Sequence, residues 1–228
     1  SNCQLCQETH AHCIFEYIYF ARLDSTLDGI NIYDARIRAG AALAAAYPED
    51  ADLVTGVLIP DPAAKGYSEA SGIPFALAFY KNSYVGRTFI KPTQKERELS
   101  VRLKLNVLEP VVRGKRIILV DDSIVRGTTI ANLIRMLKNA GAKSVHVRVS
   151  SPPFLYPCYF GTDIPSNKQL IASSHTADEI CAMIGADSLG YMNTRDLQSM
   201  AGNLPLCKAC FDSHYPMDIT GHTADNKQ

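Results

Sequence analysis

The sequence predicts an α/β fold with a mostly parallel central sheet flanked by helices. Short apolar runs alternate with segments of helical periodicity, as in folds of this class. The run Arg116–Val120 is apolar on both faces, which is typical of a strand buried inside a parallel sheet. The segment Thr128–Asn139 places Ile130, Leu133 and Leu137 on one side of an amphipathic helix. With 228 residues, the chain fits one large domain with a small appendage.

The elements can be assigned in order along the chain. The apolar, aromatic run Phe15–Arg22 predicts a buried strand, and the alanine-rich segment Asn31–Tyr47 predicts a helix that Pro48 ends. Lys81 to Asn106 is polar and too long for an ordinary connection, so it is either functional or disordered. The other predicted strands are Asp52–Ile59, Pro74–Tyr80, Ser144–Val149 and Ser188–Met192, and the other helices are Pro62 to about Gly72, Ala177–Ile184 and Arg195–Ala201.

Composition narrows the function classes. Apolar residues make up 46% and charged residues 20% of the chain, and the formal net charge is zero, as in ordinary soluble globular proteins. Without a basic cluster we expect no nucleic-acid partner, and without an apolar run of about 18 residues we expect no membrane span. Seven cysteines and no secretory signal indicate a reducing, cytoplasmic setting, with metal binding or free thiols.

A polar loop follows the central predicted strand, in the string VDDSIVRGTT (120–129). In parallel sheets, ligands bind at the carboxyl ends of the strands. Gly127 and the start of the next helix suit one phosphate, because its first N–H groups are unpaired and the helix dipole is positive there. Neither GxxxxGK[ST] nor GxGxxG is present, so this is neither a Walker loop nor a dinucleotide fingerprint. Asp121 and Asp122 would then hold hydroxyls or a metal; the alternative is a solvated turn with two exposed aspartates.

The strings CIFEYIYFAR (13–22), KNSYVGRTFIKP (81–92), SVRLKLN (100–106), VDDSIVRGTT (120–129), SSPPFLYPCYFG (150–161), LIASSHT (170–176), IGADSL (184–189) and CKACFDSHYP (207–216) occur in this order. Together they resemble the glutamine phosphoribosylpyrophosphate amidotransferases, in the half with the type I phosphoribosyltransferase fold. The resemblance runs from about Cys13 to Pro216 and lacks the amino-terminal glutaminase domain. It implies residues 1–12 as linker or tag remnant, 13–216 as the phosphoribosyltransferase domain and 217–228 as a disordered tail.

The resemblance implies an enzyme of purine synthesis. In this family, ammonia displaces pyrophosphate from phosphoribosyl pyrophosphate to give 5-phosphoribosylamine, with Mg²⁺ bridging ribose and pyrophosphate oxygens. Carried onto this sequence, Asp121 and Asp122 bind the ribose hydroxyls and Mg²⁺, and the loop holds the 5′-phosphate. The implied substrate-binding residues are Asp61, Asp121, Asp122, Ser123, Ile124, Val125, Arg126, Gly127, Thr128 and Thr129.

The long segment 81–106 matches the flexible loop of that family. The resemblance implies that Lys81 and Arg87 reach the pyrophosphate, and that Tyr84 walls an apolar passage for ammonia. We therefore take Lys81, Tyr84 and Arg87 as candidate catalytic residues; the alternative is a plain surface loop. Replacing Arg87 by alanine should then lower turnover at least tenfold with the fold intact.

Four cysteines match the iron–sulfur branch of the family: Cys13, Cys158, Cys207 and Cys210. Four thiolates from distant parts of the chain suit a 4Fe–4S cluster, with a structural zinc as the alternative. Such a site would cross-link the terminal segments into a small subdomain. For Cys181 we prefer the reading of a small buried apolar residue, and Cys3 and Cys6 match no position with a role in the family.

Three positions differ from the family pattern. Pro62 follows Asp61 where the family has Ser or Thr, and about three residues are missing before the next helix. Ser83 stands where the family has arginine, and Leu23 stands where it has proline. The first two differences fall where pyrophosphate would bind.

Alternative functions are a regulator that binds phosphoribosyl pyrophosphate without catalysis and an inactive paralogue. The neutral charge and the flexible-loop match favour the enzyme. The resemblance further implies purine nucleotides as inhibitors, a glutaminase domain in the full-length protein and a homo-oligomer.

Overall fold

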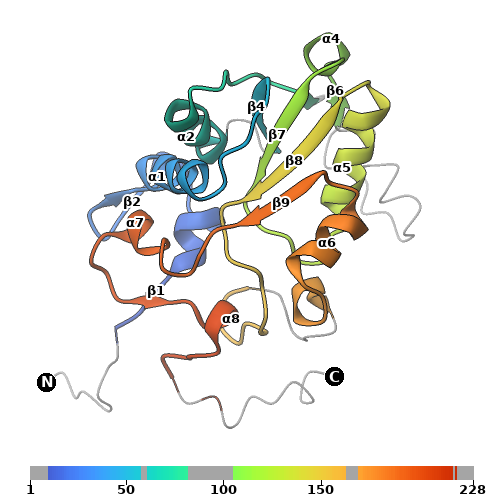
Figure 1. Ribbon diagram of the computed structural model, residues 1–228. Coiled ribbons are helices and arrows are strands. Elements are labelled where there is room, and N and C mark those ends of the chain that lie inside the picture. Colours follow the sequence, from blue (N-terminus) through green and yellow to red (C-terminus); the bar gives the residue numbers. More distant parts are fainter. Residues whose placement is uncertain (1–9, 58–60, 82–104, 163–168, 218, 220–228) are drawn as a thin grey trace, which may run out of the picture.

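A computed structural model describes residues 10–57, 61–81, 105–162, 169–217 and 219. Its centre is a four-stranded parallel sheet in the order β4-β7-β8-β9, formed by Leu53–Gly56, Arg116–Asp121, Ser144–Val149 and Ser188–Tyr191 (Figure 1). A single bridge between Val54 and Phe75 extends the sheet beyond β4. This confirms the predicted α/β class with a parallel sheet.

Two pairs of helices cover the two faces of the sheet. Helices α1 (Ile32–Ala46) and α2 (Pro62–Ser71) pack on one face, and α5 (Thr128–Asn139) and α6 (Ala177–Ile184) lie on the other (Figure 1). Strand β7 is buried on both faces: Ile118 and Val120 join the core under α1, whereas Ile117 and Leu119 join the core under α5. The two-sided burial that the sequence predicts for this strand is confirmed.

Local signals in the sequence explain where the helices begin and end. Asn31 accepts a hydrogen bond from Asp34 N and so caps α1, and Thr176 and Glu179 form a capping box at α6. Gly72 and Gly185 adopt left-handed conformations at the ends of α2 and α6. The bounds predicted for α5, α6 and β8 are confirmed residue for residue.

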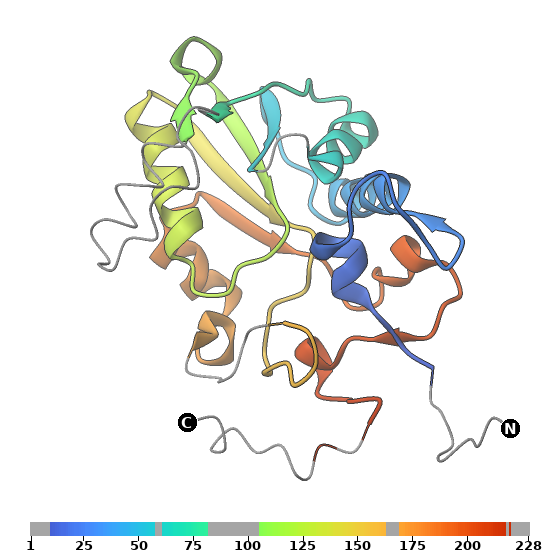
Figure 2. The same cartoon turned by 180° about the vertical axis from the view of Figure 1, so that it is seen from behind.

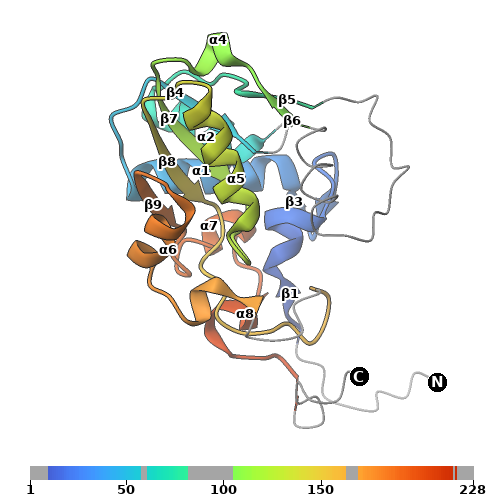
Figure 3. The ribbon, with the colours of Figure 1, turned by 90° about the vertical axis from the view of Figure 1, so that its right-hand side faces the viewer.

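The smaller elements lie around this centre. Strands β2 (Thr26–Leu27) and β3 (Ile30–Asn31) form a hairpin, and β5 (Phe79–Lys81) pairs with β6 (Leu105–Val107). Strand β1 (His12–Cys13) pairs in parallel with β10 (Leu206–Cys207), so segments from the two ends of the chain lie side by side (Figures 2 and 3). The remaining elements are α4 (Glu109–Val112), η3 (Ile171–Ser173), α7 (Gln198–Ala201) and α8 (Ala209–Asp212).

The strand predicted at Phe15–Arg22 is wrong. Glu16–Phe20 forms a π-helical turn, η1. A short apolar run does not distinguish a strand from a buried helical turn, and here the Arg36 guanidinium accommodates the turn by donating to three of the carbonyls around it. Three other elements are shorter than predicted: β4 ends at Gly56, β5 begins only at Phe79 and α7 only at Gln198.

Two further predictions fall mostly or wholly outside the described residues. The long segment 81–106 is described only at Lys81 and from Leu105 onward, and the tail after Ile219 is not described. Among the helices that the structure describes, none has the length and apolar character needed to cross a bilayer.

Candidate active site

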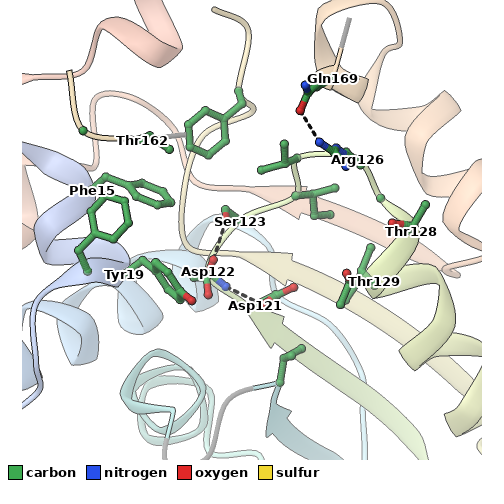
Figure 4. Close-up of a pocket in the computed structure, with 18 residues that line it drawn as sticks. Phe15, Tyr19, Asp121, Asp122, Ser123, Arg126, Thr128, Thr129, Thr162 and Gln169 are labelled. Atoms are coloured by element: carbon green, nitrogen blue, oxygen red, sulfur yellow. Dashed lines mark hydrogen bonds between the residues drawn. The ribbon is translucent and has the colours of Figure 1, made fainter. Parts of the chain in front are cut away.

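The loop after β7 forms one wall of a cavity of about 700 Å³. All nine residues from Asp121 to Thr129 line it, so the structure brings together the loop residues predicted from the sequence (Figure 4). The cavity lies at the carboxyl end of a central strand, where parallel sheets bind ligands.

The acidic pair lies at one end of the loop and lines the cavity. Asp121 is 8% exposed and its Oδ1 accepts a hydrogen bond from Asp122 N at 3.0 Å. Ser123 Oγ donates to Asp122 Oδ1 at 2.6 Å (Figure 4). Burial raises the pKa of both carboxyls, and the charge of Asp122 raises that of Asp121 further. A cation or hydroxyl donors at this position would relieve the cost of holding two charges in a buried site.

The start of α5 lies at the other end of the loop and lines the same cavity. Gly127 precedes the helix with φ +77°, and no side chain caps the first turn. Its backbone N–H groups therefore remain available to an anion, and the hydroxyl residues Thr128 and Thr129 line the same cavity. Arg126 donates to Gln169 Oε1 at the rim (Figure 4). This end can hold one phosphate group.

An aromatic wall that was not predicted from the sequence lines the cavity together with the loop. Phe15, Tyr19 and Phe20 reach the cavity from the η1 region, and Phe154 reaches it from the segment after β8. Their rings contact one another, with 5.3 Å between the centroids of Phe15 and Phe154. The strings CIFEYIYFAR and SSPPFLYPCYFG contain these residues, but their apolar character alone indicates a core rather than a site. Val57, Ile130, Gly161, Thr162 and Gln169 complete the part of the lining that was not predicted.

Asp61 lies near the acidic pair but does not line the cavity. It caps α2, where its Oδ1 accepts hydrogen bonds from Ala63 N at 3.0 Å and Ala64 N at 3.3 Å. Burial raises its pKa to about 7, and the negative charge of Asp122 acts in the same direction. Asp61 is not among the residues that line the cavity, so its predicted contact with substrate remains a prediction.

The predicted loop residues are only partly described. Lys81 ends β5 with an exposed side chain and does not line the cavity among the described residues. Tyr84, Arg87 and Ser83 lie outside the described residues.

The four predicted cysteine ligands line a second cavity of about 670 Å³: Cys13, Cys158, Cys207 and Cys210. The β1–β10 pairing places Cys13 beside Cys207, and all five described cysteines are free thiols. Burial raises the pKa of Cys13, Cys207 and Cys210, whereas backbone hydrogen bonds hold that of Cys158 below its usual value. Within the described residues, no group of three or more His, Cys, Asp or Glu side chains is placed so that it could hold a metal ion.

The two cavities share part of their walls. Phe15, Phe20, Gly161 and Thr162 line both. Thr162 N also donates to Cys158 Sγ at 3.4 Å. The cysteine cavity is therefore adjacent to the candidate active site.

Comparisons with known proteins agree with this geometry. Residues 62–151 match the phosphoribosyl transferase domain family. The amidophosphoribosyltransferases of Archaeoglobus fulgidus and Bacillus subtilis are each 50% identical to the chain, over 96% and 91% of its length. These alignments cover 49% and 45% of the two relatives, so the chain spans about half the length of the curated relatives it matches.

Solved structures give the same result. The glutamine phosphoribosylpyrophosphate amidotransferase of B. subtilis, in complex with ADP and GMP, superposes with a TM-score of 0.85 at 48% identity. The match covers 93% of this chain and 48% of that one. The central parallel sheet, its flanking helices and the loop after β7 thus belong to the type I phosphoribosyltransferase fold. Over nearly its whole length the chain is thus similar to about half of each of these amidophosphoribosyltransferases, and it shares the phosphoribosyltransferase fold of that half.

Proposed function

We propose that this domain transfers a phosphoribosyl group to ammonia: ammonia displaces pyrophosphate from C1 of phosphoribosyl pyrophosphate and 5-phosphoribosylamine forms, as a step of purine synthesis. One observation carries the proposal. A single cavity is lined by a loop that has two buried carboxylates at one end and an uncapped helix start at the other. These two ends of the loop match the hydroxyl-bearing ribose and the phosphate of a 5-phosphoribosyl group.

In this proposal, different residues of the cavity bind the phosphate and the ribose. The first N–H groups of α5, with Ser123, Thr128 and Thr129, hold the 5′-phosphate. Asp121 and Asp122 accept hydrogen bonds from the ribose hydroxyls. As the bond to pyrophosphate breaks, positive charge develops on the ribose, and the two carboxylates stabilise it. Neutral ammonia is already a nucleophile, so the step needs no strong general base.

The acidic pair also fits Mg²⁺. Carboxylate oxygens are the ligands that this ion prefers, and two of them lie next to each other at the cavity. When bound, Mg²⁺ neutralises charge on the leaving pyrophosphate. Lys81, Tyr84 and Arg87 remain the proposed residues of the segment that closes over the site and excludes water, which competes with ammonia.

The start of α2 differs from the start of α5 in the region where pyrophosphate would bind. At the start of α2, which follows the shortened Asp61-Pro62 segment, the N–H groups of Ala63 and Ala64 already donate to the Asp61 carboxylate. They are therefore not free to bind an anion. Pro62 at the first position supplies no N–H group. We therefore assign the pyrophosphate to Mg²⁺ and to cations of the segment 81–106 rather than to α2.

The direct test measures pyrophosphate released from phosphoribosyl pyrophosphate with ammonium chloride and Mg²⁺ present. We expect release that depends on ammonium, and a loss of at least tenfold in Asp122→Asn. Arg87→Ala should lose at least tenfold as well. Tight binding of phosphoribosyl pyrophosphate without release would instead identify a non-catalytic binding protein.

We also propose that Cys13, Cys158, Cys207 and Cys210 hold a 4Fe–4S cluster. Their shared cavity and their free state support this. Zinc is the weaker alternative, because it would draw the thiolates around one ion at about 2.3 Å from each sulfur, whereas a cluster binds each thiolate through a different iron. The cluster would join the terminal segments of the domain, which we place at residues 13–216.

The remaining proposals concern the whole protein. We infer a glutaminase domain in the full-length protein that supplies ammonia, a homo-oligomeric assembly and a cytoplasmic location. The B. subtilis relative was solved with ADP and GMP, and this supports purine nucleotides as inhibitors of this chain too.

A further inference from the structure

Arg36 connects two walls of the candidate site without lining it. It lies on α1, and its guanidinium donates to Tyr17 O, Tyr19 O and Ala21 O, each at 2.9 Å. These carbonyls belong to η1 and to the residue after it. A π-helical turn has few regular partners for its carbonyls, and the planar guanidinium satisfies three of them at once.

The turn that Arg36 holds contributes directly to the cavity. Tyr19 and Phe20 line it although their side chains are 45% and 42% exposed, and Figure 4 shows Tyr19 beside Asp122. Both rings contact Phe15, with centroid distances of 6.0 Å from Tyr19 and 5.1 Å from Phe20. Because much of each side chain is exposed, their orientation also depends on the backbone that carries them, and Arg36 fixes this backbone.

The charge of Arg36 also acts on the acidic residues of the site. Its guanidinium donates to the Tyr19 carbonyl, and Tyr19 lies beside Asp122 (Figure 4). Arg36 therefore attracts this carboxylate and that of Asp61, although no direct ion pair forms. Asp121 and Asp122 are adjacent in the chain and line one cavity, so their negative charges repel each other. A half-buried cation beside them offsets part of this repulsion.

We propose that Arg36 is a positioning residue of the site. Its guanidinium fixes the η1 turn that presents Tyr19 and Phe20 to the substrate cavity, and its charge sets how strongly the acidic pair attracts a divalent cation. The kinetic part of this inference rests on the proposed transfer reaction, whereas the cation part rests only on the proposed divalent-cation site at Asp121 and Asp122.

Arg38 provides a matched control. It lies on the same helix, and its guanidinium likewise donates to backbone carbonyls, those of Ser199 at 2.7 Å and Met200 at 3.0 Å. These carbonyls belong to α7, and no residue of α7 lines the cavity. Loss of Arg38 therefore removes comparable hydrogen bonds without touching the site.

The experiment compares Arg36→Met, Arg36→Lys and Arg38→Met with the wild type. Mn²⁺ binding is measured without substrate at pH 8 by electron paramagnetic resonance, together with kcat and KM for phosphoribosyl pyrophosphate. In Arg36→Met we expect the Kd for Mn²⁺ to fall about fivefold, because a competing positive charge is gone. The KM should rise about tenfold, since the substrate is an anion and the aromatic wall is loosened.

Arg36→Lys separates the charge from the hydrogen-bonding shape. It should keep the Kd for Mn²⁺ within about twofold of wild type, but lose about tenfold in kcat/KM, because an ammonium group does not span three carbonyls. Arg38→Met should match the wild type in both measurements. An unchanged Kd for Mn²⁺ in Arg36→Met, or an equal kinetic loss in Arg38→Met, overturns the inference. If the wild type releases no pyrophosphate, the proposed function fails, and the Mn²⁺ comparison still decides the role of Arg36.

Discussion

Gly127 controls the phosphate end of the cavity. Its φ of +77° lies in the left-handed region, and a Cβ there would come within 3.1 Å of Ile171 Cδ1 and 3.4 Å of Ile184 Cγ2. Any other residue here would be strained by the left-handed backbone and crowded by the side chains of Ile184 on α6 and Ile171 on η3. The uncapped start of α5 therefore depends on a glycine at this position.

We expect Gly127→Ala to lower the free energy of unfolding by about 1–2 kcal/mol and to weaken ribose 5-phosphate binding at least tenfold. Urea unfolding and titration calorimetry measure the two effects. Gly114→Ala is a suitable control, because Gly114 has a similar φ of +72° but nothing within 4 Å of its Cβ position. If both variants bind ribose 5-phosphate equally well, the loop does not act through Gly127.

Asp61 makes stability depend on pH in an unusual direction. Burial raises its pKa from 3.8 to about 7, so the folded protein binds a proton more tightly than the unfolded chain. The stabilisation is fully present below about pH 4 and is lost as pH rises through about 7. Asp121 and Asp122, whose pKa values are also raised, add to the same slope.

Asp61→Asn should keep the helix cap and remove the buried charge, because Asn caps as well as Asp. At pH 8 we expect the variant to be more stable than the wild type by about 1–2 kcal/mol, with a smaller decline between pH 4 and pH 7. Asp61→Ala, which also loses the cap, should be about 1 kcal/mol less stable than Asp61→Asn. Urea unfolding at a series of pH values provides the test, and an Asn variant with the wild-type slope would contradict it.

At the level of whole elements, helices α1 and α2 contact each other at Gly40 and Gly66. A Cβ at Gly40 would lie 1.9 Å from Ala63 O, and one at Gly66 would lie 2.1 Å from Ile37 O. The two backbones therefore approach more closely than any side chain permits. This contact fixes α2, and with it Asp61, against α1, which carries Arg36.

Gly40→Ala should destabilise the fold by at least about 3 kcal/mol, although alanine in an open helical site would stabilise it by about 0.5–1 kcal/mol. Exposed Ala45 on the same helix gives the comparison: Ala45→Gly should cost only about 0.5–1 kcal/mol. Chemical denaturation of both variants measures the difference. A Gly40→Ala protein as stable as the wild type would mean that the helices can separate at no cost.

Sequence reasoning succeeded for elements that carry their own signals. Helix α5 has amphipathic periodicity, and α6 has a capping box and a terminal glycine, so their bounds follow from local residues alone. It failed for η1, because the residue that accommodates this turn, Arg36, lies fifteen or more positions further along the chain. The aromatic wall of the cavity was not predicted for the same reason, because its residues come from segments that are distant in the sequence.

Across the whole molecule, the cysteine cavity brings the two ends of the domain together. Cys13 comes from β1, Cys207 from β10 and Cys210 from α8, while Cys158 belongs to the segment after β8. Within the described residues, the β1–β10 pair is only two residues long on each strand. A bound cluster would add a strong cross-link to this weak pairing.

Cys210→Ser should lose bound iron and sulfide in anaerobically purified protein and lower the Tm by roughly 5 °C. Cys181→Ser should retain both, because Cys181 lies on α6 away from the cavity and its thiol donates to Ala186 O at 3.4 Å. Iron and sulfide analysis with thermal melting tests the pair. Wild-type protein free of iron and sulfide would remove the cluster from the proposed function.

The sequence by itself determined the fold class, the strand that is buried on both faces and the loop from Asp121 to Thr129. Each is encoded in neighbouring residues, through periodicity, an acidic pair and a glycine before a helix. Only the tertiary structure decided that Asp61 caps α2, that Arg36 fixes η1, and that an aromatic wall and the cysteine cavity adjoin the site. These features depend on contacts between segments far apart in the chain, and the packing of whole elements sets such contacts rather than any local pattern.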